Sequence, residues 1–306
     1  MKEWSVISMF SGCGGMDLGF IGGFSFLKYD YDLNPFKIIW ANEINSAACK
    51  TYRVNIGIEI MEGDIREKIY FLPKSADVII GGFPCQDISI NGKMLGLEGL
   101  RSSLYSYMVQ AVEIVRPKVF VVENVGGLLL KKNCDALSKI LSDFEYTDYN
   151  VQYSLYHAED YGVPQTRERI FIVGTRKDCP EFVPPTPTKI SPVTAKEALK
   201  DLENMDENKD FSHIWSKALV SGEQGNRRLI ADRPGYTIRA ECHGNIQFHY
   251  SLPRRISMRE AARIQSFPDT FIFPCGLRET ERQIGNAVPP VLSWHLASSV
   301  KRVLEG

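Results

Sequence analysis

The stretch Ser5-Val6-Ile7-Ser8-Met9-Phe10-Ser11-Gly12-Cys13-Gly14-Gly15 decides the fold. Its first six residues are mainly apolar and predict a buried strand. The next five contain too much glycine for a helix or a strand, and a helix is expected to begin within residues 16–20. A strand, a glycine turn and a helix in this order hold nucleotide-type cofactors, because bare backbone can approach the ligand. A glycine turn also serves helix packing, so this stretch alone leaves both interpretations open.

Strands and helices continue to alternate after this first unit. They predict an α/β fold, a doubly wound and mostly parallel sheet, with a smaller loop-rich part. Further strands are expected at residues 38–42, 58–61, 78–80, 117–122, 151–156 and 170–173, and helices at residues 45–55, 104–115, 133–144, 257–265 and 291–303. Residues 29–36 look like a surface insertion, and residues 179–250 look irregular because prolines break any long element.

Two acidic residues follow predicted strands. Glu43 ends the second strand, where a carboxylate can accept hydrogen bonds from a ribose diol. Asp64 follows the third strand and can accept from an adenine amino group, with Ile65 packing beside the ring. Exposed carboxylates at strand ends are also common, so these roles are hypotheses. The glycines at positions 12, 14, 15 and 19 do not match the GxGxxG spacing, which disfavours a nicotinamide-dependent oxidoreductase.

The second informative stretch is Gly81-Gly82-Phe83-Pro84-Cys85-Gln86. Cys85 follows a buried strand and is a candidate nucleophile, because a thiolate attacks electron-poor carbon well. The alternative is a buried cysteine that acts as a small apolar residue. Residues 86–101 contain three glycines and predict a mobile, lid-like loop. Glu123 ends the next strand of the sheet, so it is expected to face the same pocket as Cys85.

Basic residues are unevenly distributed. Arg167 and Arg169 alternate and should share one face of an extended segment, suited to phosphate or carbonyl recognition or else to salt bridges. The formal net charge of the chain is −1, but residues 225–302 hold twelve Lys and Arg against six Asp and Glu. A basic segment of this kind can bind a phosphate backbone, although a solvated helix face gives the same count.

Composition excludes several classes of protein. The chain has 306 residues, of which 44% are hydrophobic and 24% charged, as in ordinary soluble domains. No apolar run approaches the roughly 20 residues that span a bilayer, and the amino terminus shows no signal-peptide pattern. The seven cysteines are scattered without a CxxC pair, so neither a metal site nor a disulfide framework is expected. Reduced thiols in a cytoplasmic protein fit best.

These motifs together resemble the DNA (cytosine-5) methyltransferases, in particular the short bacterial modification enzymes. The resemblance rests on six segments in the family's order, at residues 10–20, 81–86, 123–125, 165–169, 259–268 and 285–288. It covers most of the chain outside residues 179–250. Three departures concern Gly99-Leu100-Arg101, where relatives often have Asp before the Arg, Ile44, where an aromatic residue is common, and the stretch between the first two segments, which is longer than usual because of residues 29–36.

The resemblance implies S-adenosylmethionine as the cofactor and a covalent mechanism on a flipped-out base. Cys85 would add to carbon 6 of cytosine, Glu123 would assist at ring nitrogen 3, and Arg167 and Arg169 would hold the base carbonyl or a flanking phosphate. The implied cofactor residues are Phe10, Gly12, Gly14, Gly15, Glu43, Ile44, Asp64, Ile65, Pro84, Leu104, Asn286 and Val288.

The resemblance also implies an organisation in three parts. Residues 1–179 would form the catalytic and cofactor-binding domain, residues 180–275 the target-recognition domain, and residues 276–306 a segment that returns to the catalytic domain. Duplex DNA is the expected partner of a monomer, with a cognate restriction endonuclease acting on the same site without a stable complex. The candidate DNA contacts are Ser89, Arg101, Gln165, Arg227, Arg228, Arg233, Arg239, His243 and Asn245.

Two alternative functions share these motifs. A tRNA cytosine-5 methyltransferase would use the same catalytic residues on another nucleic acid. A catalytically inactive DNA-binding module would require Cys85 or Glu123 to be replaced, and both are present.

Overall fold

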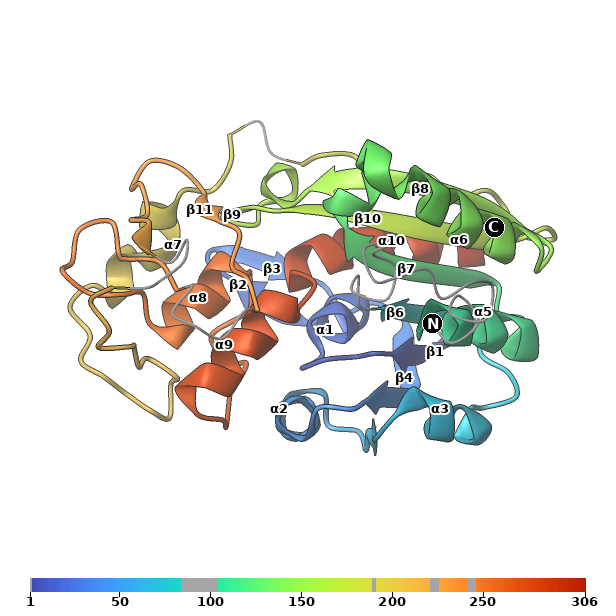
Figure 1. Cartoon of the computed structure of the whole chain (residues 1–306), viewed down its shortest axis with the longest axis horizontal. Coiled ribbons are helices and arrows are strands. Elements are labelled where there is room, and N and C mark those ends of the chain that lie inside the picture. The colour runs from blue at the N-terminus through green and yellow to red at the C-terminus, as the bar shows by residue number, and fades with distance from the viewer. Residues whose placement is uncertain (1, 84–103, 189–190, 221–225, 241–245) are drawn as a thin grey trace.

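The computed structural model describes residues 2–83, 104–188, 191–220, 226–240 and 246–306. In these ranges a central β-sheet carries helices on both faces, and a smaller, loop-rich part extends from one end of it (Figure 1). The strands are β1 (Trp4–Met9), β2 (Phe24–Phe26), β3 (Tyr29–Tyr31), β4 (Phe36–Glu43), β5 (Met61–Glu62), β6 (Val78–Gly82), β7 (Val119–Val125), β8 (Tyr149–His157), β9 (Gln165–Thr166), β10 (Glu168–Arg176) and β11 (Gly235–Tyr236). The α-helices are α1 (Gly15–Ile21), α2 (Ser46–Ile56), α3 (Ile65–Lys68), α5 (Leu104–Val115), α6 (Cys134–Glu145), α7 (Ala195–Leu199), α8 (Met258–Ile264), α9 (Leu277–Asn286) and α10 (Pro290–Glu305). Short 3-10 helices are η1 (Ile69–Phe71), η3 (Gly126–Leu129), η4 (Lys131–Asn133), η5 (Ala158–Tyr161) and η6 (Lys200–Leu202).

The main sheet has the strand order β5-β4-β1-β6-β7-β10-β8. β1 pairs in parallel with β4 and β6, β4 with β5, and β6 with β7. β10 runs antiparallel to both β7 and β8. The predicted doubly wound, mostly parallel sheet is therefore confirmed. Because β4, β1, β6 and β7 are parallel, their carboxyl ends meet at one edge of the sheet.

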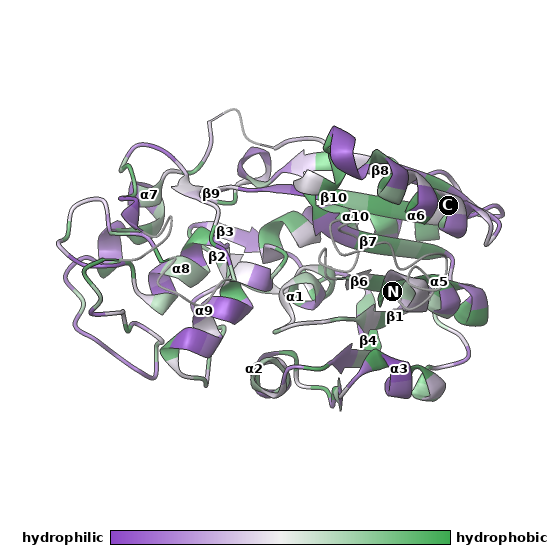
Figure 2. Ribbon diagram, in the orientation of Figure 1, coloured by the Kyte–Doolittle hydropathy of each residue, from purple (hydrophilic) through white to green (hydrophobic). Residues whose placement is uncertain are grey.

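Alternate side chains of the strands supply two cores, one on each face. Val6 belongs to the cluster under α1, α2 and α10, whereas Ile7 belongs to the cluster under α3, α5 and α6. Both residues are fully buried. Figure 2 shows the hydrophobic residues concentrated along the central strands. Strands covered on both faces read as continuous apolar runs, which is why they were visible in the sequence.

A third hydrophobic cluster builds the smaller part. It runs from Ala195 on α7 through α8 to Ile284 and Ala287 at the end of α9. α9 packs on α8 within this cluster. The helix that returns to the sheet is α10, which lies against α1 (Figure 1).

Several arginines of the basic segment lie inside this part and not on its surface. Arg255, Arg259 and Arg263 are between 0 and 7% exposed. The Arg259 guanidinium donates to the carbonyls of Phe211, Pro268 and Phe271 at 2.8–3.0 Å. Arg263 is paired with two aspartates. The charge count from the sequence therefore overstates the positive charge that the surface offers to nucleic acid.

Some predicted elements differ from the structure. Residues 29–36 are not a plain surface insertion: β2 and β3 form a hairpin whose Tyr31 is buried and stacks on Phe24 at a centroid distance of 5.0 Å. The strand predicted at residues 58–61 is reduced to β5, two residues long. Neither α7 nor α9 was predicted. α7 begins with a capping box of Thr194 and Glu197, a signal present in the sequence.

Other local predictions are confirmed. α5 has the predicted bounds, and α8 begins with the capping box in which the Ser257 and Glu260 side chains each accept from the other's backbone N–H. α10 starts at Pro290, as expected for proline in a first turn. No helix in the described ranges is long and apolar enough to cross a bilayer.

The contact between α1 and α10 leads to a stability prediction. A Cβ atom on Gly19 would lie 2.4 Å from Ser293 Cβ and 2.5 Å from the Pro290 carbonyl oxygen. We expect Gly19→Ala to lower the free energy of unfolding by about 1–3 kcal/mol, because overpacking outweighs the helix propensity of alanine. Urea denaturation would measure it. Gly276→Ala is the control, since a Cβ there meets nothing within 4 Å, and it should cost less than about 1 kcal/mol. Equal effects of the two substitutions would contradict this interpretation of the packing.

Candidate active site

The glycine turn connects β1 to α1 at the carboxyl edge of the sheet. Phe10, Gly12 and Gly14 have φ values of 55°, 56° and 93°, in the region that favours glycine. A Cβ on Gly12 would meet nothing within 4 Å, so the backbone there faces open space. A Cβ on Gly15 would lie 2.5 Å from the Val288 carbonyl oxygen. The turn is therefore open on one side and closely packed on the other.

Glu43 links the glycine turn to the end of β4. Its Oε2 atom accepts from the backbone N–H of Gly12 at 2.9 Å, and its Oε1 atom accepts from that of Asn45 at 2.8 Å. Burial raises the pKa of Glu43, while these backbone donors oppose the shift. Each carboxylate oxygen keeps a second lone pair, so the group can still accept from a ligand. Ile44, the next residue, is 65% exposed.

The chain after β5 is fixed by a residue that the sequence reasoning missed. Asn42 is 1% exposed, and its Nδ2 atom donates to the carbonyls of Met61 and Gly63 at 2.7 and 2.9 Å. A polar residue inside an apolar strand was the available signal. The loop held in this way carries Asp64, which caps α3 and pairs with Arg66, so its pKa is lowered. Ile65 follows it and is buried.

Glu123 lies at the end of β7, next to the strand that leads to Cys85. In the parallel register Glu123 is opposite Gly82, and a Cβ on Gly82 would lie 2.7 Å from Glu123 Oε2. Asn124 supports this corner, since its Nδ2 atom donates to the Phe83 carbonyl at 3.2 Å. Cys85 itself, with Pro84, Ser89 and Arg101, lies outside the described residues. Leu104 begins α5 immediately after that segment.

Arg169 and Arg167, predicted to share one face of an extended segment, have different contact partners. Arg169 Nε lies 2.6 Å from Glu123 Oε1, and both side chains are about one-tenth exposed. Arg167 is fully buried. Its guanidinium donates to the carbonyls of Ile238, Gly285 and Ala287 at 2.7–3.1 Å. Only Arg169 is therefore beside the strand-end carboxylate.

Gln165 lies in the same junction as Arg167. It is fully buried, its Nε2 atom donates to the Ile264 carbonyl at 3.1 Å, and its Oε1 atom accepts from the Ile238 backbone N–H at 3.0 Å. This position is the opposite of the exposed one expected for a DNA contact. Gln165 and Arg167 connect three parts of the fold through hydrogen bonds to backbone groups. These parts are the main sheet, the segment that contains Ile238, and α9.

Four of the candidate DNA contacts are exposed arginines of the smaller part. These are Arg227, Arg228, Arg233 and Arg239. Arg228 also supports a loop, because it donates to the Leu252 carbonyl at 2.9 Å. The backbone of Arg239 packs tightly on Gly285, where a Cβ would lie 2.5 Å from the Arg239 carbonyl oxygen. His243 and Asn245 lie outside the described residues.

The chain returns to the glycine turn after α9. Asn286 is exposed, and Val288 is buried in the cluster under α1 and α10. The contact between Gly15 and Val288 places this segment beside the turn, so residues almost 280 positions apart meet there. The carboxyl edge of the sheet thus brings together the glycine turn, Glu43, the Asp64 loop, the Val288 segment and, one strand further, Glu123 with Arg169.

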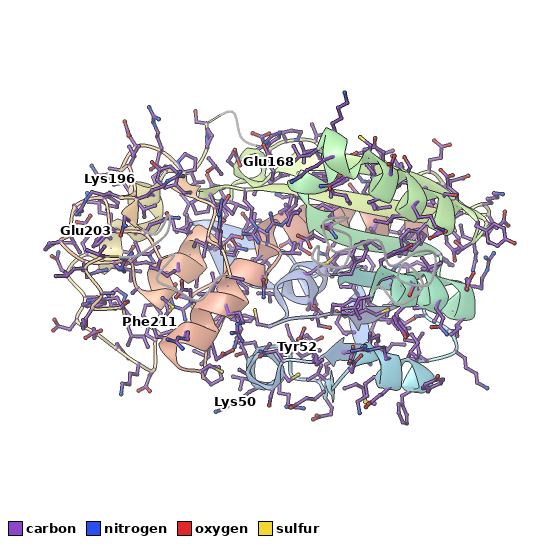
Figure 3. All side chains as sticks on the ribbon, viewed as in Figure 1. Lys50, Tyr52, Glu168, Lys196, Glu203 and Phe211 are labelled. Carbon is purple, nitrogen blue, oxygen red and sulfur yellow. The ribbon has the colours of Figure 1, made fainter. Side chains whose placement is uncertain are left out.

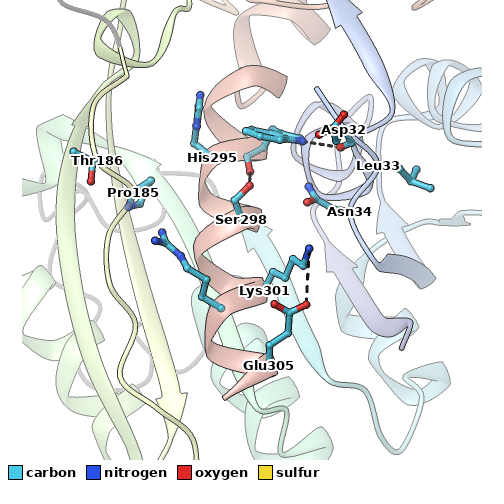
Figure 4. Close-up of a pocket in the computed structure, with 11 residues that line it drawn as sticks. Asp32, Leu33, Asn34, Pro185, Thr186, His295, Ser298, Lys301 and Glu305 are labelled. Carbon is cyan, nitrogen blue, oxygen red and sulfur yellow. Dashed lines mark hydrogen bonds and ion pairs between the residues drawn. The ribbon is translucent and has the colours of Figure 1, made fainter. Parts of the chain in front are cut away.

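Two cavities lie away from this edge. One of about 520 Å³ runs along the carboxyl-terminal half of α10, where Lys301 and Glu305 form an ion pair (Figure 4). The other, of about 840 Å³, separates the β2–β3 hairpin from α7. Among the predicted site residues that the structure describes, none lines either cavity.

Solved structures identify the class of this fold. The chain is similar to a DNA modification methyltransferase encoded within a prophage of E. coli, with a TM-score of 0.76, 25% identity and coverage of 99% of this chain and 100% of that one. It also shares its fold with a methyltransferase of Entamoeba histolytica, EhMeth, with a TM-score of 0.71 and 16% identity. The fold is that of an α/β methyltransferase.

Sequence comparisons give the family. The model of the C-5 cytosine-specific DNA methylases matches residues 4–236 and 216–302, and the chain belongs to this family. Among its relatives, the Type II methyltransferase M.NgoFVII of Neisseria gonorrhoeae is 38% identical, over 96% of this chain and 86% of the relative. M.FnuDI of Fusobacterium nucleatum is 35% identical, over 98% and 94%. The protein is therefore a DNA (cytosine-5) methyltransferase.

The two arginines of the junction are expected to differ in their effect on stability. We predict that Arg167→Lys lowers the free energy of unfolding by at least about 2 kcal/mol, because one ammonium group cannot serve three buried carbonyls in the geometry of the guanidinium. The matched control is Arg169→Lys, which keeps a charge beside Glu123 and should cost less than about 1 kcal/mol. Denaturant titration of both variants would test this. An unchanged free energy of unfolding in Arg167→Lys would show that the three carbonyls do not need the planar guanidinium.

Proposed function

We propose that this protein transfers a methyl group from S-adenosylmethionine to carbon 5 of a cytosine in a specific short sequence of duplex DNA. The transfer proceeds through a covalent adduct of Cys85 with a flipped-out base. One observation carries the proposal: the Glu123 carboxylate lies against Gly82, three residues before Cys85, one strand away from the open glycine turn. This supports a site in which a nucleophile, a carboxyl group and a cofactor pocket share one edge of the sheet.

The residues of the glycine turn fit S-adenosylmethionine. Gly12 leaves open space in front of its backbone, and Glu43 keeps lone pairs that suit a ribose diol. Asp64 and Ile65 would lie beside the adenine ring, and the segment of Asn286 and Val288 would close the other side of the pocket. Phe10, Gly14, Gly15, Ile44, Pro84 and Leu104 complete the proposed pocket. When bound, the cofactor supplies an electrophilic methyl group on a sulfonium.

The protein must make carbon 5 of cytosine nucleophilic. The thiolate of Cys85 forms a bond to carbon 6, which gives carbon 5 the character of an enamine. Glu123 accepts from the exocyclic amine and shares a proton with ring nitrogen 3, so that little negative charge builds up on the ring. Carbon 5 then takes the methyl group and leaves the cofactor as a neutral thioether. A water molecule accepts the proton from carbon 5, and the bond between carbon 6 and sulfur breaks to restore the Cys85 thiolate.

Arg169 orients the carboxyl group in this scheme. Its contact with Glu123 at 2.6 Å fixes the carboxylate, and the remaining guanidinium N–H groups can face the base carbonyl oxygen. Arg167, which satisfies three carbonyls inside the junction, is a positioning residue that keeps β10 in register with the recognition segment. We assign the same positioning role to Gln165.

The target base must leave the duplex, because carbons 5 and 6 are inaccessible in a stacked base pair. The unstacking costs a few kcal/mol, offset by contacts to the displaced strand and the phosphates. We assign target recognition to the smaller part. The candidate phosphate or guanine contacts there are Arg227, Arg228, Arg233 and Arg239. Further candidates, outside the described residues, are Ser89, Arg101, His243 and Asn245. The protein acts as a monomer beside a restriction endonuclease that reads the same site.

A covalent trap tests the nucleophile. Duplex DNA that carries 5-fluorocytosine at the target keeps fluorine where a proton must leave, so the adduct should persist through denaturing electrophoresis. Cys85→Ala should give no trapped band and no methylated cytosine, because it cannot form the bond to carbon 6. Bisulfite sequencing of a methylation-free host that expresses the gene would identify the target. Normal methylation by Cys85→Ala, or transfer to tRNA and not to duplex DNA, would refute the proposal.

The position of the carboxylate gives a second test. In Gly82→Ala the new methyl group takes the space of Glu123 Oε2, so we expect kcat to fall at least about tenfold, with the KM for S-adenosylmethionine little changed. Gly127→Ala is the matched control on the same edge, because its Cβ would lie 3.7 Å from Val125, an ordinary contact. If steady-state methylation assays gave both variants the wild-type kcat, the position of Glu123 would not matter.

A further inference from the structure

A buried polar cluster lies directly beneath the glycine turn. We define it as Ser8 on β1, Ser11 in the turn, Asp17 on α1 and Tyr52 on α2; Tyr52 is labelled in Figure 3, beside α1. Asp17 and Tyr52 are fully buried, and Ser8 is 1% exposed. A buried carboxyl group is costly unless hydrogen bonds satisfy it, so its presence at this position calls for a reason.

Hydrogen bonds connect the cluster to the turn. The Tyr52 hydroxyl donates to Asp17 Oδ1 at 2.7 Å, and the Ser8 hydroxyl faces the same carboxyl group. The Ser8 and Ser11 hydroxyl oxygens are 2.8 Å apart, and the Ser11 carbonyl accepts from the Gly14 backbone N–H at 3.0 Å. A continuous path therefore runs from α2 through α1 and β1 into the turn.

Packing reinforces this path. A Cβ on Gly14 would lie 3.0 Å from the Tyr52 ring, so the ring rests directly on the residue that caps α1. Asp17 is in the first turn of that helix, where a negative charge is favoured by the free backbone N–H groups. Phe10 at the start of the turn is a non-glycine residue with positive φ, a strained conformation that its surroundings must maintain.

We propose that Asp17, through Tyr52 and Ser8, is a positioning residue that holds the glycine turn in the shape required to bind S-adenosylmethionine. The inference rests on the proposed function, since the turn is the cofactor cradle in that proposal. Asp17 touches no reacting atom and acts only through the turn. The cluster joins β1, α1 and α2, and the contact between the Ser8 and Ser11 hydroxyls carries it into the turn.

The hydrogen bonds of the cluster favour the ionised form of Asp17, whereas its burial disfavours that form. Burial raises its pKa to about 6, while hydrogen bonds from Tyr52 and Ser8 lower it. The other titratable groups near it are the Cys13 thiol and the Tyr52 phenol, whose pKa values burial raises, so both are neutral at pH 5–7.5. On the α10 side, Ser293 donates to the Met16 carbonyl. Because the folded pKa lies above the ordinary value, the carboxylate is present above about pH 6 and is lost as the pH falls through it.

The experiment measures binding of S-adenosylhomocysteine to the full chain by calorimetry from pH 5 to 7.5, without DNA. Glu43 also has a raised pKa, so the wild type is compared with Asp17→Asn at each pH. We expect Asp17→Asn to bind about tenfold more weakly at pH 7.5, the size of one lost charge-assisted hydrogen bond, and to lose most of the decline seen in the wild type below about pH 6. The KM for DNA should not change.

Two further variants separate positioning from stability. Tyr52→Phe removes only the donor to Asp17 and should weaken binding in the same direction. Thr51→Val is the control: Thr51 is equally buried on α2, but its hydroxyl donates to Ala47 and does not meet Asp17. Wild-type affinity and pH dependence in Asp17→Asn would overturn this inference while leaving the proposed function intact. If the wild-type protein failed to bind S-adenosylhomocysteine, both would fall.

Discussion

One buried guanidinium holds the parts of this enzyme in register. Arg167 lies between β9 and β10 and donates to the carbonyl of Ile238 in the smaller part. It also donates to the carbonyls of Gly285 and Ala287 at the end of α9. Buried carbonyls without donors are costly, so these segments can meet only where the guanidinium serves them all. The rigid, planar guanidinium thereby fixes the distance between the edge of the main sheet and the segment that contains Ile238.

The contacts around Arg167 also determine where the last segment of the chain lies beside the glycine turn. Gly285 admits the backbone of Arg239, and Gly15 admits the carbonyl of Val288, each at a distance that a side chain would exclude. The last segment of the chain is therefore pressed between the recognition segment and the glycine turn. A movement of the smaller part would be transmitted to the turn through these backbone contacts, which couples the proposed DNA side to the proposed cofactor side.

The sequence predicted the parts of this structure that depend on local pattern. The parallel strands are continuous apolar runs, and the acids at their ends could be placed because parallel strands end at one edge. Arg167 and Gln165 could not be placed, because an alternating pair looks the same whether its partners are phosphates or buried carbonyls. α9 has a polar sequence and is held by long-range packing on α8, which no local pattern reveals.

The buried arginines also bear on how DNA is bound. Arg255, Arg259 and Arg263 serve carbonyls and carboxylates inside the smaller part, so they contribute little to the field at the surface. With a net charge of −1, the protein attracts phosphate weakly as a whole. In the proposed function, affinity would come from exposed arginines such as Arg227 and Arg239 and from contacts that form only with the right bases. This favours specificity over non-specific binding, because phosphate contacts alone carry no sequence information.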